Sequence, residues 1–397
     1  MDRLFLEAVP ILERIEEAGF EAFFVGGSVR DYILGRPIND VDIATSATPL
    51  EVKAIFPKTA DVGIEHGTVL VITNSGTYEI TTFRTESGYT DYRRPDSVKF
   101  VRSLTEDLQR RDFTMNAIAM DKSGKIIDPY MGQLDLLQKK ITTVGNPHDR
   151  FSEDGLRMMR ALRFVSQLNF HLEQETFNSL KKNGPILREI AVERILVEFE
   201  KLLAGDNRIK ALNLLLESGL YQFLPQFAGQ KDNLKKILFL PINLLTVNEL
   251  WAVILIYMNM KDVEASLRAW KLPVKTIRSI QRILQLVKKE QAFEDSNLDV
   301  FKAGRIQAVQ AAKVKAILND RNVLEAEKSM TLMYESLSLK HMSDLAVSGE
   351  DLLTWHKEKP GPWVKEYLEL ILEAVLNLVI KNEKGEIKEW LNRCNLI

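Results

Sequence analysis

The chain has 397 residues, of which 45% are hydrophobic and 27% are charged, and its formal net charge at pH 7 is −2. This length exceeds one ordinary core, so we expect several domains, and the composition excludes a disordered protein. The charge balance neither supports nor excludes a nucleic-acid partner, because the 53 Lys and Arg residues could gather on one surface. A single cysteine, Cys394, excludes an internal disulfide, and the five histidines lack zinc-ligand spacing.

The N-terminal residues predict an amphipathic helix over 1–19 and not a signal peptide, because a basic start and an apolar core are missing. No apolar stretch reaches the roughly 18 residues of a membrane span, so we expect no membrane partner. The lone cysteine suits a reducing compartment. Together these features predict a cytoplasmic protein.

A pair of glycines follows the first predicted strand, 21–25. Gly26 and Gly27 let the backbone come close to a ligand, and the helix predicted from Ser28 offers free N–H groups that suit a phosphate. A Gly-Gly turn also occurs in ordinary loops, so this feature alone does not decide the function.

Two aspartates lie one residue apart on the next predicted strand, 40–44. Asp40 and Asp42 therefore point to the same face and can bind one or two hard cations, which predicts Mg²⁺ as the cofactor. Mg²⁺ held in this way bridges the oxygens of a triphosphate. Such a pair is again common in loops, but its closeness to the two glycines predicts a nucleotide site.

A short helix, 49–56, and a β-hairpin, 67–83, complete an N-terminal domain of α/β type with a small mixed, largely antiparallel sheet. Glu79 in the hairpin is either a third carboxylate beside the two aspartates or a solvated strand residue. The polar segment 84–98 contains Gly and Pro and predicts a mobile loop.

The order of these motifs resembles the class II tRNA nucleotidyltransferase and bacterial poly(A) polymerase family, and most of all its CCA-adding members. The residues that carry the resemblance are Val25-Gly26-Gly27, Arg30-Asp31, Leu34-Gly35-Arg36, and Asp40-x-Asp42 through Ala44-Thr45. The resemblance implies that Gly27 and Arg30 hold the triphosphate. It also implies that segment 84–98 takes part in the switch from adding C to adding A, and the presence of this segment favours addition of the full CCA.

Two arginines precede an apolar, helix-compatible run within 107–119. A planar guanidinium binds two triphosphate oxygens at once, although a plain surface cluster of Arg111 and Asp112 would show the same residues. The segment resembles the R-R-D-F-T-x-N-A motif of the family, which implies that Arg111 contacts the nucleotide.

Charged residues recur every three positions within 152–164, and they are Asp154, Arg157, Arg160 and Arg163. The spacing predicts one stripe on a helix, which by itself fits a solvated face equally well. Glu153-Asp154-x-x-Arg157 resembles the family motif whose Asp and Arg read the incoming base, and the resemblance places Arg160 and Arg163 in the same site. Both C and A present an amino group beside a ring acceptor, which a carboxylate and a guanidinium can bind, whereas U and G present the opposite pattern.

The amphipathic helix predicted at 192–203 resembles a family motif that braces the neck, and we assign no chemistry to it. Beyond residue 206 the patterns predict only helices, some with basic residues that could track a tRNA backbone. Four domains are predicted: a nucleotidyltransferase head at 1–145, a helical neck for base recognition at 146–205, a helical body at 206–290 and a tRNA-binding tail at 291–397.

The predicted enzyme adds CCA to the 3′ end of tRNA without a template, using CTP and ATP and releasing pyrophosphate. A poly(A) polymerase, or a family member restricted to CC or A addition, is the nearest alternative. An alternative of another class is a non-catalytic RNA-binding helical protein, against which the intact Asp40 and Asp42 argue. The sequence leaves the oligomeric state open, a homodimer included.

Overall fold

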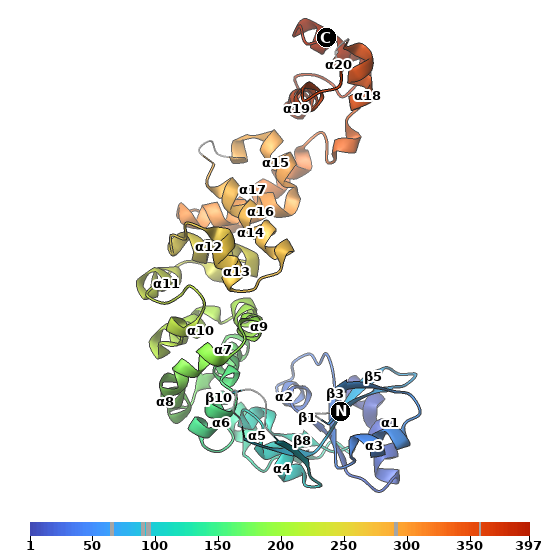
Figure 1. Ribbon diagram of the computed structural model, residues 1–397, viewed down its shortest axis with the longest axis vertical. Coiled ribbons are helices and arrows are strands. Elements are labelled where there is room, and N and C mark those ends of the chain that lie inside the picture. Colours follow the sequence, from blue (N-terminus) through green and yellow to red (C-terminus); the bar gives the residue numbers. More distant parts are fainter. Residues whose placement is uncertain (64–66, 89–91, 93–96, 290–292, 357–358) are drawn as a thin grey trace. The chain divides into compact units, whose positions relative to one another are not determined.

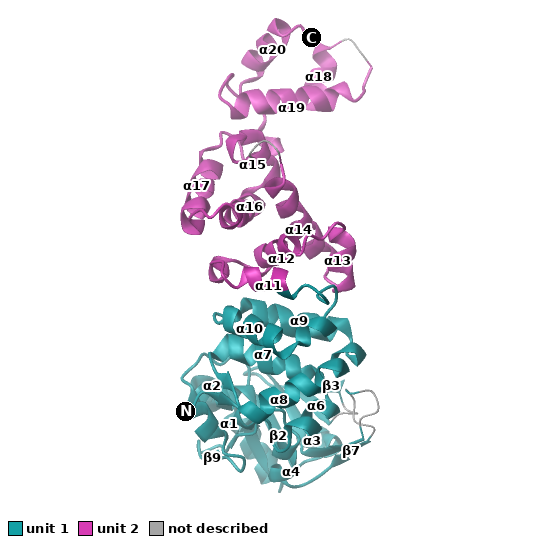
Figure 2. Cartoon of the chain, turned by 90° about the vertical axis from the view of Figure 1, so that its left-hand side faces the viewer, with its two compact units in different colours: residues 1–231 teal, residues 232–397 magenta. Residues whose placement is uncertain are grey.

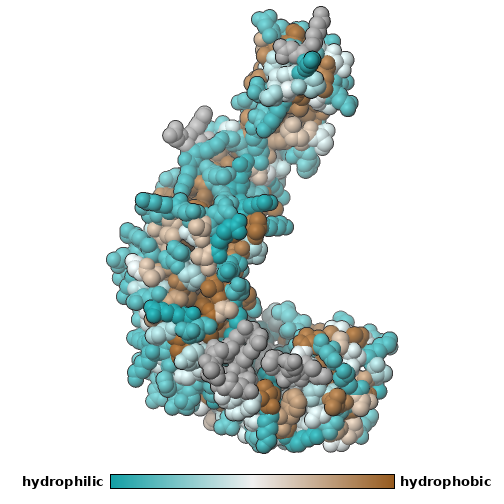
Figure 3. Space-filling view, in the orientation of Figure 1, coloured by the Kyte–Doolittle hydropathy of each residue, from teal (hydrophilic) through white to brown (hydrophobic). Residues whose placement is uncertain are grey.

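The computed structural model describes all residues except 64–66, 89–91, 93–96, 290–292 and 357–358 (Figure 1). The chain divides into two compact units, unit 1 with residues 1–231 and unit 2 with residues 232–397 (Figure 2). Hydrophilic side chains cover most of the face drawn in Figure 3, and hydrophobic ones form small separate groups. None of the helices in the described residues is both long and apolar enough to cross a membrane.

A seven-stranded sheet lies in unit 1, with the strand order β3-β4-β5-β2-β1-β8-β9. The strands are β1 Ala22–Val25, β2 Asp42–Thr45, β3 Thr59–Gly63, β4 Thr68–Ile72, β5 Thr77–Thr82, β8 Ala119–Met120 and β9 Ile126–Ile127. All neighbouring strands are antiparallel except β2 and β5, which are parallel. The prediction of a mixed, largely antiparallel sheet is therefore confirmed.

Buried and exposed side chains lie on opposite faces of the strands. In β5, Tyr78 and Ile80 are buried while Glu79 is exposed, because successive side chains point to opposite faces. In β2, Asp42 is exposed and the three residues after it are buried. Buried residues of these strands and their surroundings form one hydrophobic cluster: Val25, Ala44, Phe83, Leu108, Ala117, Ala119 and Val144. This cluster fixes the strands whose ends carry polar side chains.

Helices α1, α2 and α3 contact strands of the sheet, and further helices follow in unit 1. They are α1 Arg3–Glu17, α2 Gly27–Ile33, α3 Pro49–Ile55, α4 Leu104–Gln109, α5 Gly132–Leu137, α6 Pro147–Glu153, α7 Leu156–Leu168, α8 Gln174–Asn183, α9 Val192–Ala204 and α10 Arg208–Ser218. Two further strand pairs are β6 Arg84–Ser87 with β7 Ser97–Phe100, and β10 Lys140–Ile141 with β11 His171–Leu172. Helix α7 packs against α9 and α10 (Figure 1).

Two expectations for local structure were wrong. Segment 84–98 is not a plain loop at its ends, because β6 and β7 pair as an antiparallel hairpin, while residues 89–91 and 93–96 lie outside the described residues. The helix-compatible run after the two arginines does not form an α-helix, because α4 ends at Gln109 and is followed by the 3₁₀ helix η2, Thr114–Asn116, and by β8. The Asp112 side chain accepts a hydrogen bond from the Phe113 N–H, which takes the backbone out of the helical path.

The predicted charged stripe was also wrong in one position. Helix α6 ends at Glu153, Asp154 is its C-cap in an extended conformation, and α7 begins at Leu156. Oδ1 of Asp154 accepts a hydrogen bond from the Leu156 N–H at 3.0 Å, so the side chain satisfies a free donor at the start of α7. Asp154 therefore lies before the helix that carries the three arginines and not on it.

Unit 2 contains only helices among its described residues, so the predicted all-α C-terminal half is confirmed. They are α11 Lys231–Ile237, which begins at the boundary, α12 Val247–Tyr257, α13 Val263–Ala269, α14 Val274–Val287, α15 Asn297–Ala303, α16 Arg305–Leu318, α17 Val323–Ser336, α18 Gly349–Trp355, α19 Trp363–Leu376 and α20 Lys384–Arg393. Trp251 and Trp270 pack edge to face in its core, with ring centroids 5.1 Å apart. The boundary between the units falls inside the predicted body, and the four-domain division stays a prediction.

Candidate nucleotide-binding site

A strongly basic pocket of about 590 Å³ lies in unit 1. Eight arginines line it: Arg30, Arg84, Arg110, Arg111, Arg157, Arg160, Arg163 and Arg194. Three acidic residues line it as well: Asp42, Asp112 and Asp154. The lining thus carries an excess of five formal positive charges, although the whole chain has a net charge of −2. A pocket of this kind attracts a polyanion, and its guanidinium groups suit phosphate oxygens.

The two glycines bring the backbone close to charged groups of the pocket. Gly26 has φ +74° and caps the N-terminus of α2, a conformation that favours glycine. A Cβ at Gly26 would lie 3.1 Å from Nη1 of Arg111 and 3.5 Å from Oδ2 of Asp42. A Cβ at Gly27 would lie 3.5 Å from Nη2 of Arg30. The missing side chains therefore leave the space in which these three charged groups approach one backbone turn.

Asp42 is the first residue of β2 and feels the charges of two other acidic residues, Asp40 and Glu79. Asp42 is paired in register with Val25 of β1 on one side and with Glu79 of β5 on the other. Partners in neighbouring strands point to the same face, so Glu79 lies beside Asp42. Asp40 precedes β2 and does not line the pocket, and all three acidic residues are exposed.

Desolvation, and after it the nearby negative charge, raises the pKa of Asp42 above its ordinary value. Partial desolvation of its carboxylate and the charge of Asp40 raise the pKa, the charge of Arg111 lowers it, and the charge of Glu79 raises it further. The net shift is upward, which means that the ionised carboxylate lacks a sufficient positive partner. A bound cation would supply one.

Asp112 connects the sheet side of the pocket with α7. Its Oδ1 accepts hydrogen bonds from the Phe113 N–H at 2.8 Å and from Nδ2 of Asn116 at 2.9 Å, and its Oδ2 lies 2.7 Å from both Nε and Nη2 of Arg160. Asn116 in turn accepts a hydrogen bond from Nη1 of Arg30 at 2.8 Å. Burial raises the pKa of Asp112, but the charge of Arg160 and the Asn116 hydrogen bond contribute to holding it well below its usual range. The ionised carboxylate therefore orients both arginines.

One nitrogen of the Arg111 guanidinium has no acceptor among the described residues. Its Nη2 lies 3.3 Å from Oδ2 of Asp107, and its Nη1 lies 3.4 Å from the carbonyl oxygen of Asn116. Its Nε is buried and has no hydrogen-bond acceptor among the described residues. A buried donor without an acceptor is costly, so an oxygen-rich ligand in the pocket would be stabilised here.

Asp154 is held by an arginine from another helix. Its Oδ2 accepts a hydrogen bond from Nη2 of Arg194, on α9, at 3.0 Å. Nη1 of Arg194 is buried without an acceptor in the described part of the chain. Our sequence reasoning assigned no chemistry to this helix. The E-R-x-x-x-E pattern that contains Arg194 was the only feature of the sequence that could have pointed to it.

Arg157 is fixed on three sides. Its Nη1 donates to Oε2 of Glu153 at 2.6 Å and to the carbonyl oxygen of Arg150 at 3.1 Å, while its Nη2 donates to the carbonyl oxygen of Arg110 at 3.0 Å. The residue is 8% exposed. A guanidinium held in this way keeps one orientation.

A second residue of α9 holds the last arginine of the stripe. Nε of Arg163 lies 2.5 Å from Oε2 of Glu198, and both residues are buried. The guanidinium of Arg163 also stacks on the Phe164 ring at 4.0 Å. Glu198 likewise lies 4.0 Å from Nη1 of Arg160. The helix described above as a brace therefore orients the arginines of the pocket directly.

Every residue that we predicted for the site, except Asp40, lines this one pocket. Among the lining residues that the sequence reasoning did not assign to the site are Arg84, Arg110, Asp112, Asn116, Phe164 and Arg194. Asp112 and Asn116 belong to the R-R-D-F-T-x-N-A pattern, so their identity was visible, but their contacts with Arg160 and Arg30 join residues far apart in the chain. The individual roles of the predicted residues stay proposals.

Three family models match the chain. They describe a poly A polymerase head domain over residues 22–142, a probable RNA and SrmB-binding site of polymerase A over 169–230, and a putative tRNA nucleotidyltransferase domain 2 over 242–391. The head model is shared with poly(A) polymerases, so it does not separate the alternatives by itself.

Relatives that match over their full length distinguish a CCA-adding enzyme from a poly(A) polymerase. The CCA-adding enzyme of Geobacillus sp. (strain WCH70) is 46% identical over 401 residues, covering 100% of this chain and 99% of its own. The CCA-adding enzyme of Bacillus cereus (strain B4264) is 45% identical over 394 residues, with 99% of each chain covered. The crystal structure of the Bacillus stearothermophilus CCA-adding enzyme in complex with CTP is similar with a TM-score of 0.90 and 44% identity, covering 100% of this chain and 98% of that one.

The fold also extends to a more distant structure. The Thermotoga maritima CCA-adding enzyme complexed with tRNA has a TM-score of 0.66 at 22% identity, covering 99% of this chain and 96% of that one. The relatives at 44–46% identity do not favour a poly(A) polymerase. They show that the chain is an enzyme and not a non-catalytic RNA-binding protein. With identities of 45–46% over its whole length, the chain belongs to the CCA-adding enzymes, a family of tRNA nucleotidyltransferases.

Proposed function

We propose that the basic pocket of unit 1 binds CTP and ATP and transfers C, C and A in turn to the 3′ end of tRNA. The observation that carries this proposal is the lining of eight arginines and three aspartates. In each step the terminal 3′-hydroxyl of the tRNA gives up its proton to solvent, and its oxygen forms a bond to the α-phosphorus. The bond from this phosphorus to the oxygen that bridges to the β-phosphorus breaks, and pyrophosphate leaves.

The arginines divide between the two ends of the nucleotide. Arg30 and Arg111 flank the glycine turn and carry the donors that suit the triphosphate, among them the unpartnered Nε of Arg111. The backbone of Gly27 lies beside Arg30 without a side chain to keep the phosphates away. Because these groups are held before the ligand arrives, charge that develops on the phosphates is stabilised with little rearrangement.

Asp40 and Asp42 would hold Mg²⁺ at the end of β2. The described residues contain no ready-made cluster of three or more His, Cys, Asp or Glu residues for a metal. Two carboxylates nevertheless fit Mg²⁺, which is usually bound by one or two carboxylates and completes its shell with waters and substrate phosphates. When bound, Mg²⁺ lowers the pKa of the attacking hydroxyl and neutralises the leaving group. Glu79, beside Asp42, adds a third negative charge at this position.

Asp154 and Arg157 would select the base. The carboxylate accepts from the exocyclic amino group of C or A, and the guanidinium donates to the neighbouring ring acceptor. Arg194 holds Asp154, and Glu153 holds Arg157, so the two groups keep their positions without a nucleic-acid template. Arg160 and Arg163 extend the same wall of the pocket.

The segment 84–98 would take part in the switch from adding C to adding A. Most of its middle lies outside the described residues, but the carbonyl oxygen of Tyr92 accepts a hydrogen bond from the Gly155 N–H at 3.3 Å. Gly155 follows Asp154 directly, so this contact supports a link between the segment and base selection. We also propose the division into head, neck, body and tail stated above, with the helical parts holding the tRNA.

The test is incubation with a tRNA that lacks its terminal CCA, with CTP, ATP and Mg²⁺, followed by sequencing of the product ends. Addition of CCA followed by arrest is the expected result. A long A tail would assign the chain to poly(A) synthesis, and CC or A alone would assign it to a restricted member of the family. No extension at all would contradict an enzymatic function.

A further inference from the structure

A buried carboxylate lies beside the nucleotide pocket of unit 1 without lining it. Asp107, on α4, is fully buried and is not one of the lining residues. It contacts three residues that do line the pocket, Arg84, Arg110 and Arg111. No step of the proposed reaction uses this carboxylate directly, so any role that it has must act through those neighbours.

The two oxygens of Asp107 bind different arginines. Oδ1 accepts hydrogen bonds from Nε of Arg110 at 2.9 Å, from Nη2 of Arg110 at 2.7 Å and from the Arg84 N–H at 3.3 Å. Oδ2 accepts from Nη2 of Arg111 at 3.3 Å. Arg110 also lies 3.3 Å from Glu86, whereas Asp107 is the only acidic residue in the described part of the chain that forms an ion pair with Arg111.

These contacts keep Asp107 ionised although it is buried. Burial raises the pKa of its carboxyl group, but the charges of Arg110 and Arg111 outweigh this effect and hold the pKa below its ordinary value. An ionised carboxylate accepts through both oxygens and can therefore bind two guanidinium groups at once. It also offsets the repulsion between Arg110 and Arg111, which are neighbours in the chain. Both arginines are thus held in place before a nucleotide arrives.

The contact with Asp107 leaves the rest of the Arg111 guanidinium beside the glycine turn. Nη1 of Arg111 lies 3.4 Å from the carbonyl oxygen of Asn116, and 3.1 Å from the position that a Cβ would take at Gly26. Nε is buried and finds no acceptor among the described residues. Asp107 therefore occupies one side of the guanidinium and leaves Nε for an oxygen of the ligand.

The charge of Asp107 by itself would oppose nucleotide binding. A carboxylate beside the pocket lowers the positive potential that attracts a triphosphate. A contribution of Asp107 that favours binding can therefore come only from the way in which it arranges the arginines.

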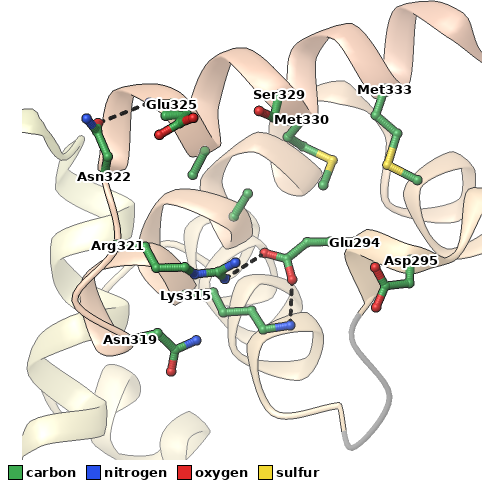
Figure 4. Close-up of a pocket in the computed structure, with 12 residues that line it drawn as sticks. Glu294, Asp295, Lys315, Asn319, Arg321, Asn322, Glu325, Ser329, Met330 and Met333 are labelled. Atoms are coloured by element: carbon green, nitrogen blue, oxygen red, sulfur yellow. Dashed lines mark hydrogen bonds and ion pairs between the residues drawn. The ribbon is translucent and has the colours of Figure 1, made fainter.

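A cavity of unit 2 shows the opposite arrangement of charges (Figure 4). It has a volume of about 730 Å³, and its lining includes Glu294, which belongs to the 3₁₀ helix η6, Phe293–Asp295. Glu294 lies 2.6 Å from Nζ of Lys315 and 3.3 Å from Nη2 of Arg321. All three charged groups line that cavity, so its cations are neutralised where a ligand would meet them. Asp107, in contrast, lies outside the lining that its arginines form.

We propose that Asp107 is a positioning residue for the triphosphate of CTP and ATP, and that it acts by holding Arg111 against the glycine turn. Groups that bind a substrate need neighbours that lock their orientation, and Asp107 is such a neighbour without touching the nucleotide itself. This inference rests on the proposed function and adds a residue to the same site. It predicts that loss of the carboxylate weakens the binding of CTP and of pyrophosphate, while the binding of CMP changes little.

The test is Asp107→Asn, a nearly isosteric change that leaves one oxygen to accept hydrogen bonds. Competition against labelled CTP gives dissociation constants for CTP, inorganic pyrophosphate and CMP. A hydrogen bond between charged groups corresponds to about tenfold in affinity, so CTP and pyrophosphate should bind about tenfold more weakly. CMP should change little, because it lacks the phosphates that Arg111 would bind. Equal losses for all three ligands would overturn the proposal, and so would CTP binding that is unchanged or tighter, as charge alone predicts.

A second substitution separates positioning from damage to the fold. In an Arg111→Ala background the group that Asp107 holds is missing, so adding Asp107→Asn should weaken pyrophosphate binding little further. A further loss of about tenfold in this background would contradict an action through Arg111. If circular dichroism shows that Asp107→Asn does not fold, Asp107→Glu replaces it. This variant keeps the charge but displaces the carboxylate by one methylene group, so the same selective loss is expected, and wild-type affinities would count against the proposal.

The matched control is Glu106→Gln, which removes one negative charge from the neighbouring position of α4. Glu106 is exposed and does not line the pocket, so none of the three dissociation constants should change appreciably. A control that weakens CTP as much as Asp107→Asn does would overturn the proposal. If wild-type protein adds CCA and Asp107→Asn keeps the wild-type affinity for CTP, only the inference about Asp107 fails, whereas wild-type protein that adds nothing contradicts the proposed function.

Discussion

Replacing Asp112 by asparagine should destabilise unit 1, although the two side chains have nearly the same shape. In the native protein both carboxylate oxygens accept hydrogen bonds, Oδ1 from Phe113 and Asn116 and Oδ2 from Arg160. An asparagine has only one side-chain oxygen. Its NH₂ group must therefore point either towards the donors of Phe113 and Asn116 or towards those of Arg160. The guanidinium of Arg160 also loses its charged partner, because Asp112, which is only 8% exposed, becomes neutral.

The expected magnitude follows from the partial burial of this ion pair. The Arg160 side chain is 34% exposed and lies 4.0 Å from Glu198, so its charge is not left wholly uncompensated. We therefore expect the loss of about 1–3 kcal/mol that follows when a buried hydrogen-bonding group loses its partner. For a unit of 231 residues, a loss of 1 kcal/mol lowers the Tm by about 2–4 °C, so Asp112→Asn should lower the Tm by about 2–12 °C. The KM for CTP should rise as well, since Arg30 and Arg160 lose the group that orients them.

Thermal unfolding of the full chain, followed by circular dichroism at pH 7, measures the effect. The control is Asp61→Asn, which breaks an exposed pair with Lys53 whose side chains are 48% and 36% exposed. An exposed pair contributes about 0.2–1 kcal/mol, so the control should lose a few degrees at most. If Asp112→Asn lowers the Tm no more than Asp61→Asn does, the view of Asp112 as a buried anchor of the pocket is refuted.

Three further predictions concern the metal, the base and the pH. Asp40→Ala or Asp42→Ala should abolish nucleotide incorporation while largely sparing tRNA binding in a filter assay, and near-normal turnover would contradict the metal assignment. Arg194→Ala should weaken discrimination against UTP about tenfold or more in competition with CTP, because a charge-assisted hydrogen bond to Asp154 contributes about 1.5–3 kcal/mol; unchanged discrimination would remove Arg194 from base selection. The pKa of Asp112 is depressed in the folded state, so its stabilising contribution is present above the unfolded pKa of about 4 and is lost as the pH falls towards the folded pKa. Urea unfolding between pH 7 and pH 3 should accordingly show a steeper loss of stability below about pH 4 in wild type than in Asp112→Asn, and parallel curves would contradict this.

Local signals in the sequence determined much of this protein. The strand that ends at Gly26 and Gly27, the strand that carries Asp42, and the helix at 192–203 were all placed within a few residues. Their patterns depend on neighbours in the chain: strand alternation, a glycine needed for a positive φ, and a helical apolar face. The resemblance then supplied the family, which the full-length relatives confirm.

Local signals failed where a side chain competes with its own backbone. The sequence predicted one helix through Asp154, and the run after Arg110 and Arg111 was compatible with a helix. In the structure the Asp154 side chain accepts from the Leu156 N–H before α7, and the Asp112 side chain accepts from the Phe113 N–H. Asp and Asn side chains offer the backbone an alternative to the helix, and spacing alone does not show which one is taken.

Only the tertiary structure decided which charged residues meet. Glu79 lies beside Asp42 because β5 pairs in parallel with β2, a register that neither strand specifies alone. Arg194 reaches Asp154 because α9 packs against α7. A sequence period reports the face on which a side chain lies, whereas contacts between distant segments depend on how whole elements pack and pair. The sequence therefore indicated many of the residues that form the site, and the fold set the contacts between them.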